Sequence, residues 1–130
     1  MTPPGRPGDL PLFVYGTLRS GGSQAHLLGP AARAEAWVQG TLWDLPAGYP
    51  ALQLAGDGKV WGERVAPVGE ALLSVLDVYE GVPEGLYQRV IVDLRAGGRV
   101  EPAWAWVMAD PRVRHGRVLP SGRWRTFRAR

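Results

Sequence analysis

The sequence contains no cysteine and only two histidines, His26 and His115. Without thiols, the chain cannot form disulfides, use a cysteine nucleophile or bind a metal through thiolates. Neither histidine sits in a spacing that is typical of a metal site. We therefore expect no metal-binding site.

The chain also lacks long apolar runs. No stretch approaches the ~18 consecutive apolar residues that a membrane span requires. No basic segment followed by an apolar one opens the sequence, as it would in a signal peptide. Residues 1–11 are instead rich in proline and glycine, and we expect a flexible leader there. With no export signal, we place the protein in the cytoplasm and expect no membrane partner.

Lysine is nearly absent. The chain contains one lysine, Lys59, and fourteen arginines, and its formal net charge is +3. From Arg112 onward there are seven arginines and no acidic residue, with Trp124 and Phe127 among them. A basic segment with interspersed aromatic residues is one signature of nucleic-acid binding. This segment is short and matches no named motif, so we do not favour nucleic acid as the partner.

Short strands bounded by glycine and proline dominate the sequence. Gly40 interrupts the apolar, Trp-rich stretch 34–45 and predicts a bend or bulge, while residues 56–58 have the composition of a hairpin turn. The last two predicted strands would form an antiparallel hairpin, and residues 111–130, which show no periodicity, are predicted to be loop and tail. The predicted strands cover residues 12–15, 34–45, 50–54, 60–65, 87–94 and 102–108.

One segment, residues 69–80, has helical periodicity, and Gly81 follows where a left-handed residue would end a helix. Its apolar residues recur at i, i+3, i+4 and i+7, which predicts a single apolar stripe. With the strands around it, this helix predicts an α+β fold whose sheet curls or closes into a small barrel, bending at glycines. The predicted stripe consists of Leu72, Val75, Leu76 and Tyr79.

The segment 13–19 is the first candidate for a ligand site. The strand at 12–15 runs directly into Gly16, which can turn sharply or let a ligand approach the backbone. A strand that ends in a glycine turn leaves several N–H groups without ladder partners, and such groups can bind an anion. Within this segment we expect Gly16 to be the position least able to change. The alternative is a plain strand-to-loop turn.

Carboxylates are the remaining candidates for catalysis, because no serine lies in a nucleophile elbow and no Walker-type phosphate loop is present. Glu80 lies at the C-terminal end of the predicted helix, where the macrodipole is negative, and Asp77 adds like charge one turn earlier. Both effects, together with burial, would raise the pKa of Glu80. Such a carboxyl can take and return a proton near neutral pH. The alternative is an exposed glutamate.

Tyr87 and Arg89 share one face at the start of the next predicted strand. If that face lines a cavity, the two side chains would offer a phenol and a fixed cation to a polar substrate. The alternative is a stacked Tyr–Arg pair on a strand face.

Several short motifs occur in an order and spacing that resemble the gamma-glutamylcyclotransferase-like superfamily, nearest its gamma-glutamylamine cyclotransferase branch. The resemblance covers about residues 12–124, so we expect a single domain there and a basic tail at 125–130. The motifs are YGTL at 15–18, GYPAL at 48–52, VWGE at 60–63, LDVYEG at 76–81, YQR at 87–89 and GRW at 122–124.

The resemblance implies a small mixed β-barrel with flanking helices and a pocket at one mouth. It also implies a cofactor-independent cyclisation that converts a γ-glutamyl amine or amino acid to 5-oxoproline and a free amine, with Glu80 as general acid and base. A non-catalytic barrel that binds a small carboxylated metabolite is the alternative, and the identity of the amine and the oligomeric state stay open. The predicted substrate-binding residues are Tyr15, Gly16, Thr17, Leu18, Arg19, Pro50, Tyr87 and Arg89.

Overall fold

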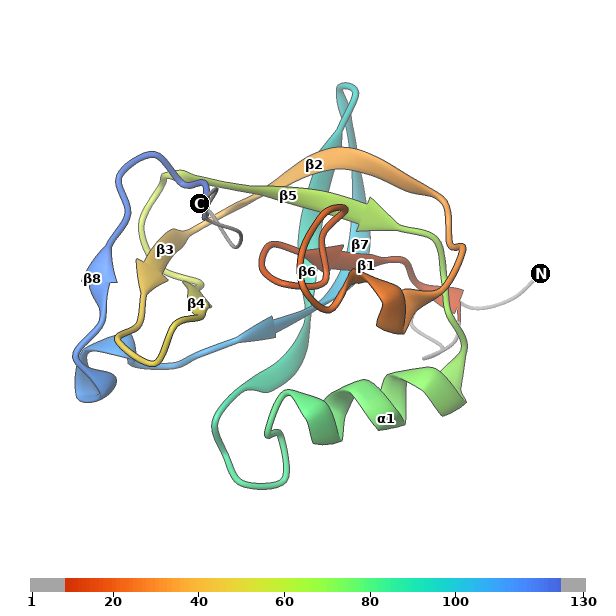
Figure 1. The fold of residues 1–130 in the computed structure, drawn as a ribbon. Helices are drawn as coiled ribbons and strands as arrows, with labels where there is room; N and C mark the ends of the chain where they lie inside the picture. The colour runs from red at the N-terminus through yellow and green to blue at the C-terminus, as the bar shows by residue number, and fades with distance from the viewer. Residues whose placement is uncertain (1–8, 125–130) are drawn as a thin grey trace.

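A computed structural model describes residues 9–124 of the chain. Its regular elements are mostly short strands, and the single α-helix of the described part, α1, lies below them in the view of Figure 1. In chain order the elements are β1 (Leu12–Val14), the 3₁₀ helix η2 (Ala25–Leu28), β2 (Arg33–Gln39), β3 (Thr41–Asp44), β4 (Pro50–Gln53), β5 (Lys59–Val65), α1 (Glu70–Tyr79), β6 (Gln88–Ala96), β7 (Arg99–Val107), the 3₁₀ helix η3 (Pro111–Arg114) and β8 (Arg117–Val118).

Five strands close into a barrel in the order β1-β5-β2-β6-β7. β1 pairs with β7 in parallel, and the other neighbours pair antiparallel, so the barrel is mixed. The β6–β7 hairpin runs from Gln88 opposite Val107 to Ala96 opposite Arg99, which confirms the predicted antiparallel hairpin. The prediction of a small mixed β-barrel in an α+β fold is therefore confirmed.

Strands β4, β3 and β8 form a second, three-stranded sheet beside the barrel (Figure 1). The apolar stretch that we predicted as one interrupted strand divides at Gly40 into β2 of the barrel and β3 of this sheet. A Cβ at Gly40 would lie 2.6 Å from the carbonyl oxygen of Gln53, so the chain can pass this point only as glycine. The predicted interruption at Gly40 is confirmed.

Two predictions, the hairpin turn at 56–58 and the irregular structure from residue 111 onward, are wrong. Residues 56–58 join β4 of the small sheet to β5 of the barrel, so they link strands with different partners and form no hairpin turn. Residues 111–124, predicted as loop and tail, contain η3 and β8. The Asp110 carboxylate caps η3 by accepting the Arg112 N–H at 3.2 Å, and β8 pairs with β3 far away in sequence. The predicted basic tail, 125–130, lies outside the described residues.

Fewer residues of helix α1 are buried against the barrel than its periodicity predicted. Leu73 and Leu76 are its buried residues, whereas Val75 and Tyr79 are 60% and 47% exposed. The helix lies along one side of the strands (Figure 1), so only its innermost residues are covered, and the predicted stripe is wrong at Val75 and Tyr79. Gly81, with φ of 74°, ends the helix as predicted. No helix in the part of the chain described here is long and apolar enough to cross a membrane.

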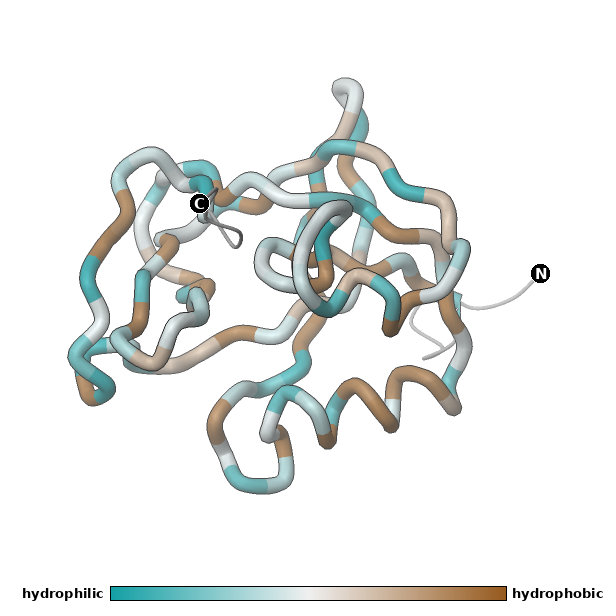
Figure 2. The backbone as a smooth tube through the Cα atoms, in the orientation of Figure 1, coloured by the Kyte–Doolittle hydropathy of each residue, from teal (hydrophilic) through white to brown (hydrophobic). Residues whose placement is uncertain are grey.

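Strand β1 lies between two apolar cores. Because side chains alternate along a strand, Leu12 and Val14 join the cluster that contains the buried residues of α1, while Phe13 and Tyr15 join the cluster inside the barrel. Figure 2 shows apolar residues recurring along the strands and α1, with mostly hydrophilic turns between them. The end of β1 is thereby held from both sides, which fixes the start of the loop that follows.

The beginning of the described chain is packed against the barrel. Leu10 and Pro11, which we assigned to the leader, are buried, and the Pro11 carbonyl accepts the Trp104 N–H at 2.9 Å. The packed part of the chain therefore begins before residue 12. Residues 1–8 of the predicted leader lie outside the described part.

Candidate active site

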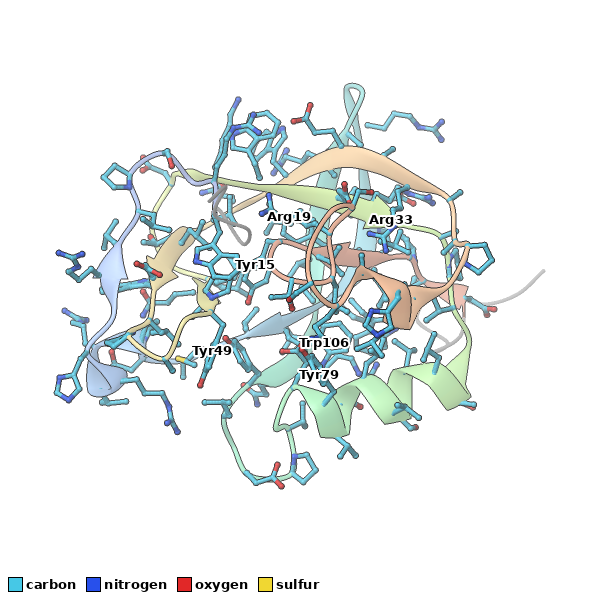
Figure 3. All side chains as sticks on the ribbon, in the orientation of Figure 1. Tyr15, Arg19, Arg33, Tyr49, Tyr79 and Trp106 are labelled. Carbon is cyan, nitrogen blue, oxygen red and sulfur yellow. The ribbon has the colours of Figure 1, made fainter. Side chains whose placement is uncertain are left out.

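A cavity of about 330 Å³ lies at the end of β1, bounded by the loop after β1, the β3–β4 turn and the end of α1. Seven of the nine predicted site residues line it, and Arg19 and Arg89 do not. In Figure 3, Tyr49 and Tyr79 lie on either side of the space below Tyr15. Among residues 9–124, no group of three or more histidine, aspartate or glutamate side chains could hold a metal ion. The other lining residues are Phe13, Val14, Gly48, Tyr49, Tyr79, Leu86 and Trp106.

The loop after β1 lines this cavity and has several free N–H groups. The Arg19 N–H donates to the Gly16 carbonyl at 3.1 Å and closes a turn, and the Arg19 Nε donates to the same carbonyl at 3.2 Å. The Thr17 carbonyl accepts the Gln24 N–H at 2.9 Å. Because the C=O and N–H of a trans peptide point in opposite directions, the N–H groups of Thr17 and Leu18 face away from these bonds. Within residues 9–124 the N–H groups of Gly16, Thr17 and Leu18 donate no hydrogen bond, so they can bind an anion.

Gly16 is constrained by close packing against the opposite wall of the cavity. A Cβ at this position would lie 3.0 Å from Cγ of Pro50. Gly22 is enclosed more tightly, because its Cβ would lie 2.3 Å from the Thr17 carbonyl oxygen. The expectation that Gly16 is the least replaceable position of the segment 13–19 stays a prediction, and Gly22, which follows that segment, packs on backbone.

The two buried tyrosines of the cavity use their hydroxyl groups to hold β4. The Tyr15 hydroxyl donates to the Trp106 carbonyl at 2.6 Å and accepts the Leu52 N–H at 3.1 Å. The Tyr87 hydroxyl donates to the Pro50 carbonyl. Burial raises the pKa of both phenols above the ordinary value. The phenolic proton of Tyr87, which we expected to serve a substrate, is thus already engaged by the backbone.

Glu80 follows the last residue of α1 and carries the only carboxyl group among the described residues that line the cavity. Burial, with a smaller contribution from the Asp77 carboxylate, raises the pKa of Glu80 from 4.5 to about 7. The predicted direction is confirmed, although burial is the larger cause. No donor in the described residues bonds this carboxyl group, so its oxygens remain available to a ligand.

Arg19 and Arg89 have partners within the protein. Arg19 donates to the carbonyl groups of Gly16 and Trp124. Arg89 forms a two-bond ion pair with Asp77, with Nε–Oδ1 and Nη2–Oδ2 distances of 2.8 and 3.0 Å. Because α1 brings Asp77 against β6, this carboxylate takes the cation that we expected to face the cavity. Neither arginine lines the cavity, so their substrate-binding roles stay predictions, and Arg19 acts on the loop backbone.

Residues 122–124 pack beside the loop at Gly16, which the sequence reasoning did not anticipate. The Gly122 carbonyl accepts the Trp61 N–H at 2.8 Å and lays this segment along β5. Trp124 is only 7% exposed, and its Nε1 donates to Asp44 at 3.3 Å. Its ring would lie 3.9 Å from a Cβ at Gly16. The GRW motif was the one available signal for this contact.

The sequence matches the family described as Gamma-glutamyl cyclotransferase, AIG2-like over residues 12–126. Among solved structures, YkqA from Bacillus subtilis is 27% identical with a TM-score of 0.68, over 88% of this chain and 39% of YkqA. PH0828 from Pyrococcus horikoshii, an uncharacterized protein, is 27% identical with a TM-score of 0.67, over 88% of both chains. An AIG2-like protein from Mus musculus is 26% identical with a TM-score of 0.64, over 77% of both chains. A search of curated proteins gives no match.

Proposed function

Because the chain belongs to the gamma-glutamyl cyclotransferase, AIG2-like family, we propose that it converts a γ-glutamyl amine or amino acid to 5-oxoproline and a free amine. Family and fold support a cyclotransferase-type activity in general. The substrate class and the residue roles below are our proposal. We also keep the cytoplasm as the proposed location of the activity.

The proposed reaction needs no nucleophile from the protein. The α-amino nitrogen of the substrate attacks its own γ-carbonyl carbon, which forms the ring C–N bond, and the C–N bond to the leaving amine then breaks. Attack is intramolecular, so the protein has only to bind and orient one molecule. No serine, cysteine or cofactor enters this scheme.

Glu80 carries the proton in this scheme. Its carboxylate accepts the proton lost by the attacking nitrogen and returns it to the leaving nitrogen, so the reaction is balanced in protons and electrons. With a pKa of about 7, Glu80 exists in both protonation states near neutral pH, as a group that must both accept and donate requires.

The free N–H groups at residues 16–18 would hold the negative charge of the substrate. They can bind its α-carboxylate or the oxyanion that develops on the γ-carbonyl. No arginine or lysine is among the residues that line the cavity in the described chain, so backbone donors are the available partners. The observation that carries the proposal is that one cavity contains both these donors and a carboxyl group with a pKa near 7.

Replacement of Glu80 by glutamine tests the proposal. Glu80→Gln keeps the shape of the side chain but cannot accept the proton, so 5-oxoproline release should fall by about 100-fold or more. Binding of 5-oxoproline, measured by calorimetry, should be retained. Glu84→Gln is the matched control, because Glu84 is exposed four residues later and does not line the cavity.

The outcomes separate the enzyme from the non-catalytic alternative. If Glu80→Gln turns over a γ-glutamyl substrate as fast as the unchanged protein, the assignment of Glu80 is wrong. If the unchanged protein binds 5-oxoproline but releases it from no γ-glutamyl compound, the barrel is a metabolite-binding protein and the proposed reaction is wrong.

A further inference from the structure

Arg33, at the start of β2, contacts the loop on the side away from the cavity. Its Nη1 donates to the Leu18 carbonyl at 2.7 Å, and its Nη2 donates to the Ala25 carbonyl at 3.2 Å. In the view of Figure 3, Arg19 and Arg33 lie higher than Tyr15, whereas Tyr49 and Tyr79 lie lower. The Arg33 side chain is only 15% exposed, so water competes little for these carbonyl groups.

Glu63 of β5 fixes the position of Arg33. The Glu63 Oε1 lies 2.8 Å from Nη1 of Arg33 and accepts the Ser20 N–H at 2.8 Å. The ion pair therefore ties the loop at residues 18, 20 and 25 to two neighbouring strands of the barrel. Since β2 and β5 are rigid elements, they impose their geometry on the loop.

The bond from Arg33 acts on the peptide that closes the turn. The carbonyl of the Leu18–Arg19 peptide accepts from Arg33, and the N–H of the same peptide donates to the Gly16 carbonyl. A trans peptide points these two groups in opposite directions. The bond to Arg33 therefore supports the turn that leaves the N–H groups of Thr17 and Leu18 free.

We propose that Arg33, held by Glu63, is a positioning residue that orients the N–H groups of residues 16–18 for the substrate without contacting it. The kinetic part of this proposal rests on the proposed function. Its structural part, the orientation of the loop in the unliganded protein, does not.

Arg33→Met retains most of the aliphatic stem and removes every donor. The Leu18 carbonyl and the Glu63 carboxylate then lose a partner. The turn also loses the hydrogen bond that supports it on the side away from the cavity. A misplacement of about 1 Å in a site can cost roughly 100-fold in rate, so we expect kcat/KM to fall by about ten- to hundredfold. Both KM and kcat should change, because the same N–H groups bind the substrate and the developing oxyanion. The pH dependence should not change, since Glu80 belongs to another wall of the cavity.

Arg64→Met is the matched control. Arg64 lies on β5 and also forms a partly buried ion pair, with Glu101 at 2.5 Å, but no hydrogen bond or ion pair joins it to the loop. The test compares both variants in two measurements. The first is the steady-state release of 5-oxoproline. The second is the amide ¹H–¹⁵N spectrum of the unliganded protein, in which the resonances of residues 16–18 report the loop.

The proposal predicts that Arg33→Met shifts these three resonances and lowers kcat/KM, and that Arg64→Met does neither. Unchanged loop resonances in Arg33→Met would overturn it, as would an equal kinetic loss in both variants. If Arg33→Met does not fold, Arg33→Lys replaces it. Lysine lacks the guanidinium fork, so the same resonances should move by less, and no movement would overturn the proposal. If the unchanged protein releases no 5-oxoproline, the proposed function fails while the spectra still decide the positioning.

Discussion

Replacing Glu80 by glutamine should stabilise the protein at alkaline pH, in addition to its effect on activity. Folding raises the pKa of Glu80 from 4.5 to about 7, chiefly by burial. Between these values the folded state retains a proton that the unfolded state has lost. Stability therefore falls as the pH rises from 4.5 to 7 and is level above that. At about 1.4 kcal/mol per pH unit, the loss amounts to roughly 3 kcal/mol. This figure is an upper bound, because Glu80 keeps partial contact with water.

Urea denaturation at about pH 4 and about pH 8 measures this effect. The free energies of unfolding of the unchanged protein and Glu80→Gln should agree at the lower pH. At the higher pH, the variant should be more stable by about 2–3 kcal/mol. Glu84→Gln should show no such pH-dependent difference. If Glu80→Gln differs from the unchanged protein equally at both pH values, folding does not raise the pKa of Glu80 and the reasoning is refuted.

Three further predictions concern residues in or beside the cavity. Asp77→Asn removes the carboxylate that helps to raise the pKa of Glu80, so the limb of the pH–rate profile that reports Glu80 should move to lower pH. An unmoved limb would show that this carboxylate has no influence. Gly16→Ala places a Cβ 3.0 Å from Pro50, and such overpacking should cost about 1–3 kcal/mol in thermal denaturation and raise KM. An unchanged KM would mean that Pro50 moves aside at little cost. Tyr87→Phe leaves the Pro50 carbonyl without its donor, at a cost of about 1–3 kcal/mol of stability. Its pH–rate profile should be unchanged, and a lost limb would instead make the phenol a catalytic acid.

The parts of the site that could be predicted are those whose signals are local in sequence. The strand at 12–15 and the glycines after it indicated a loop with free N–H groups. The position of Glu80 beside Gly81, one turn after Asp77, indicated a helix end and a raised pKa. Each of these inferences needed only a few neighbouring residues, and the cavity brings the loop and Glu80 together.

The parts that could not be predicted depend on contacts between distant segments. Arg33 lies 15 positions from Leu18, and nothing in its own surroundings indicates that it holds the loop. The ion pair of Arg89 with Asp77 depends on how α1 lies against β6, which periodicity does not determine. The same packing buries Leu73 and exposes Val75, the reverse of the predicted stripe for these two positions.

Nucleic-acid binding through residues 112–130 stays a prediction that we do not favour. Residues 125–130 lie outside the described part of the chain. Among the described arginines of this segment, Arg123 has partners within the protein. Its Nη1 lies 3.4 Å from Oε2 of Glu35, and its Cζ lies 4.5 Å from the ring centroid of Trp61. Retention on single-stranded RNA that is strong at low salt and lost at high salt would support binding. No retention at low salt would exclude it.

The pH dependence of 5-oxoproline release by the unchanged protein tests the central claim most directly. A panel of γ-glutamyl amines and γ-glutamyl amino acids provides the substrates, and the released amine is measured beside 5-oxoproline. We predict that at least one substrate yields the two products in equal amounts, with a limb near pH 7 in kcat/KM that is absent from the residual activity of Glu80→Gln. No 5-oxoproline from any member of the panel, or a limb near pH 7 that survives in Glu80→Gln, would contradict the account.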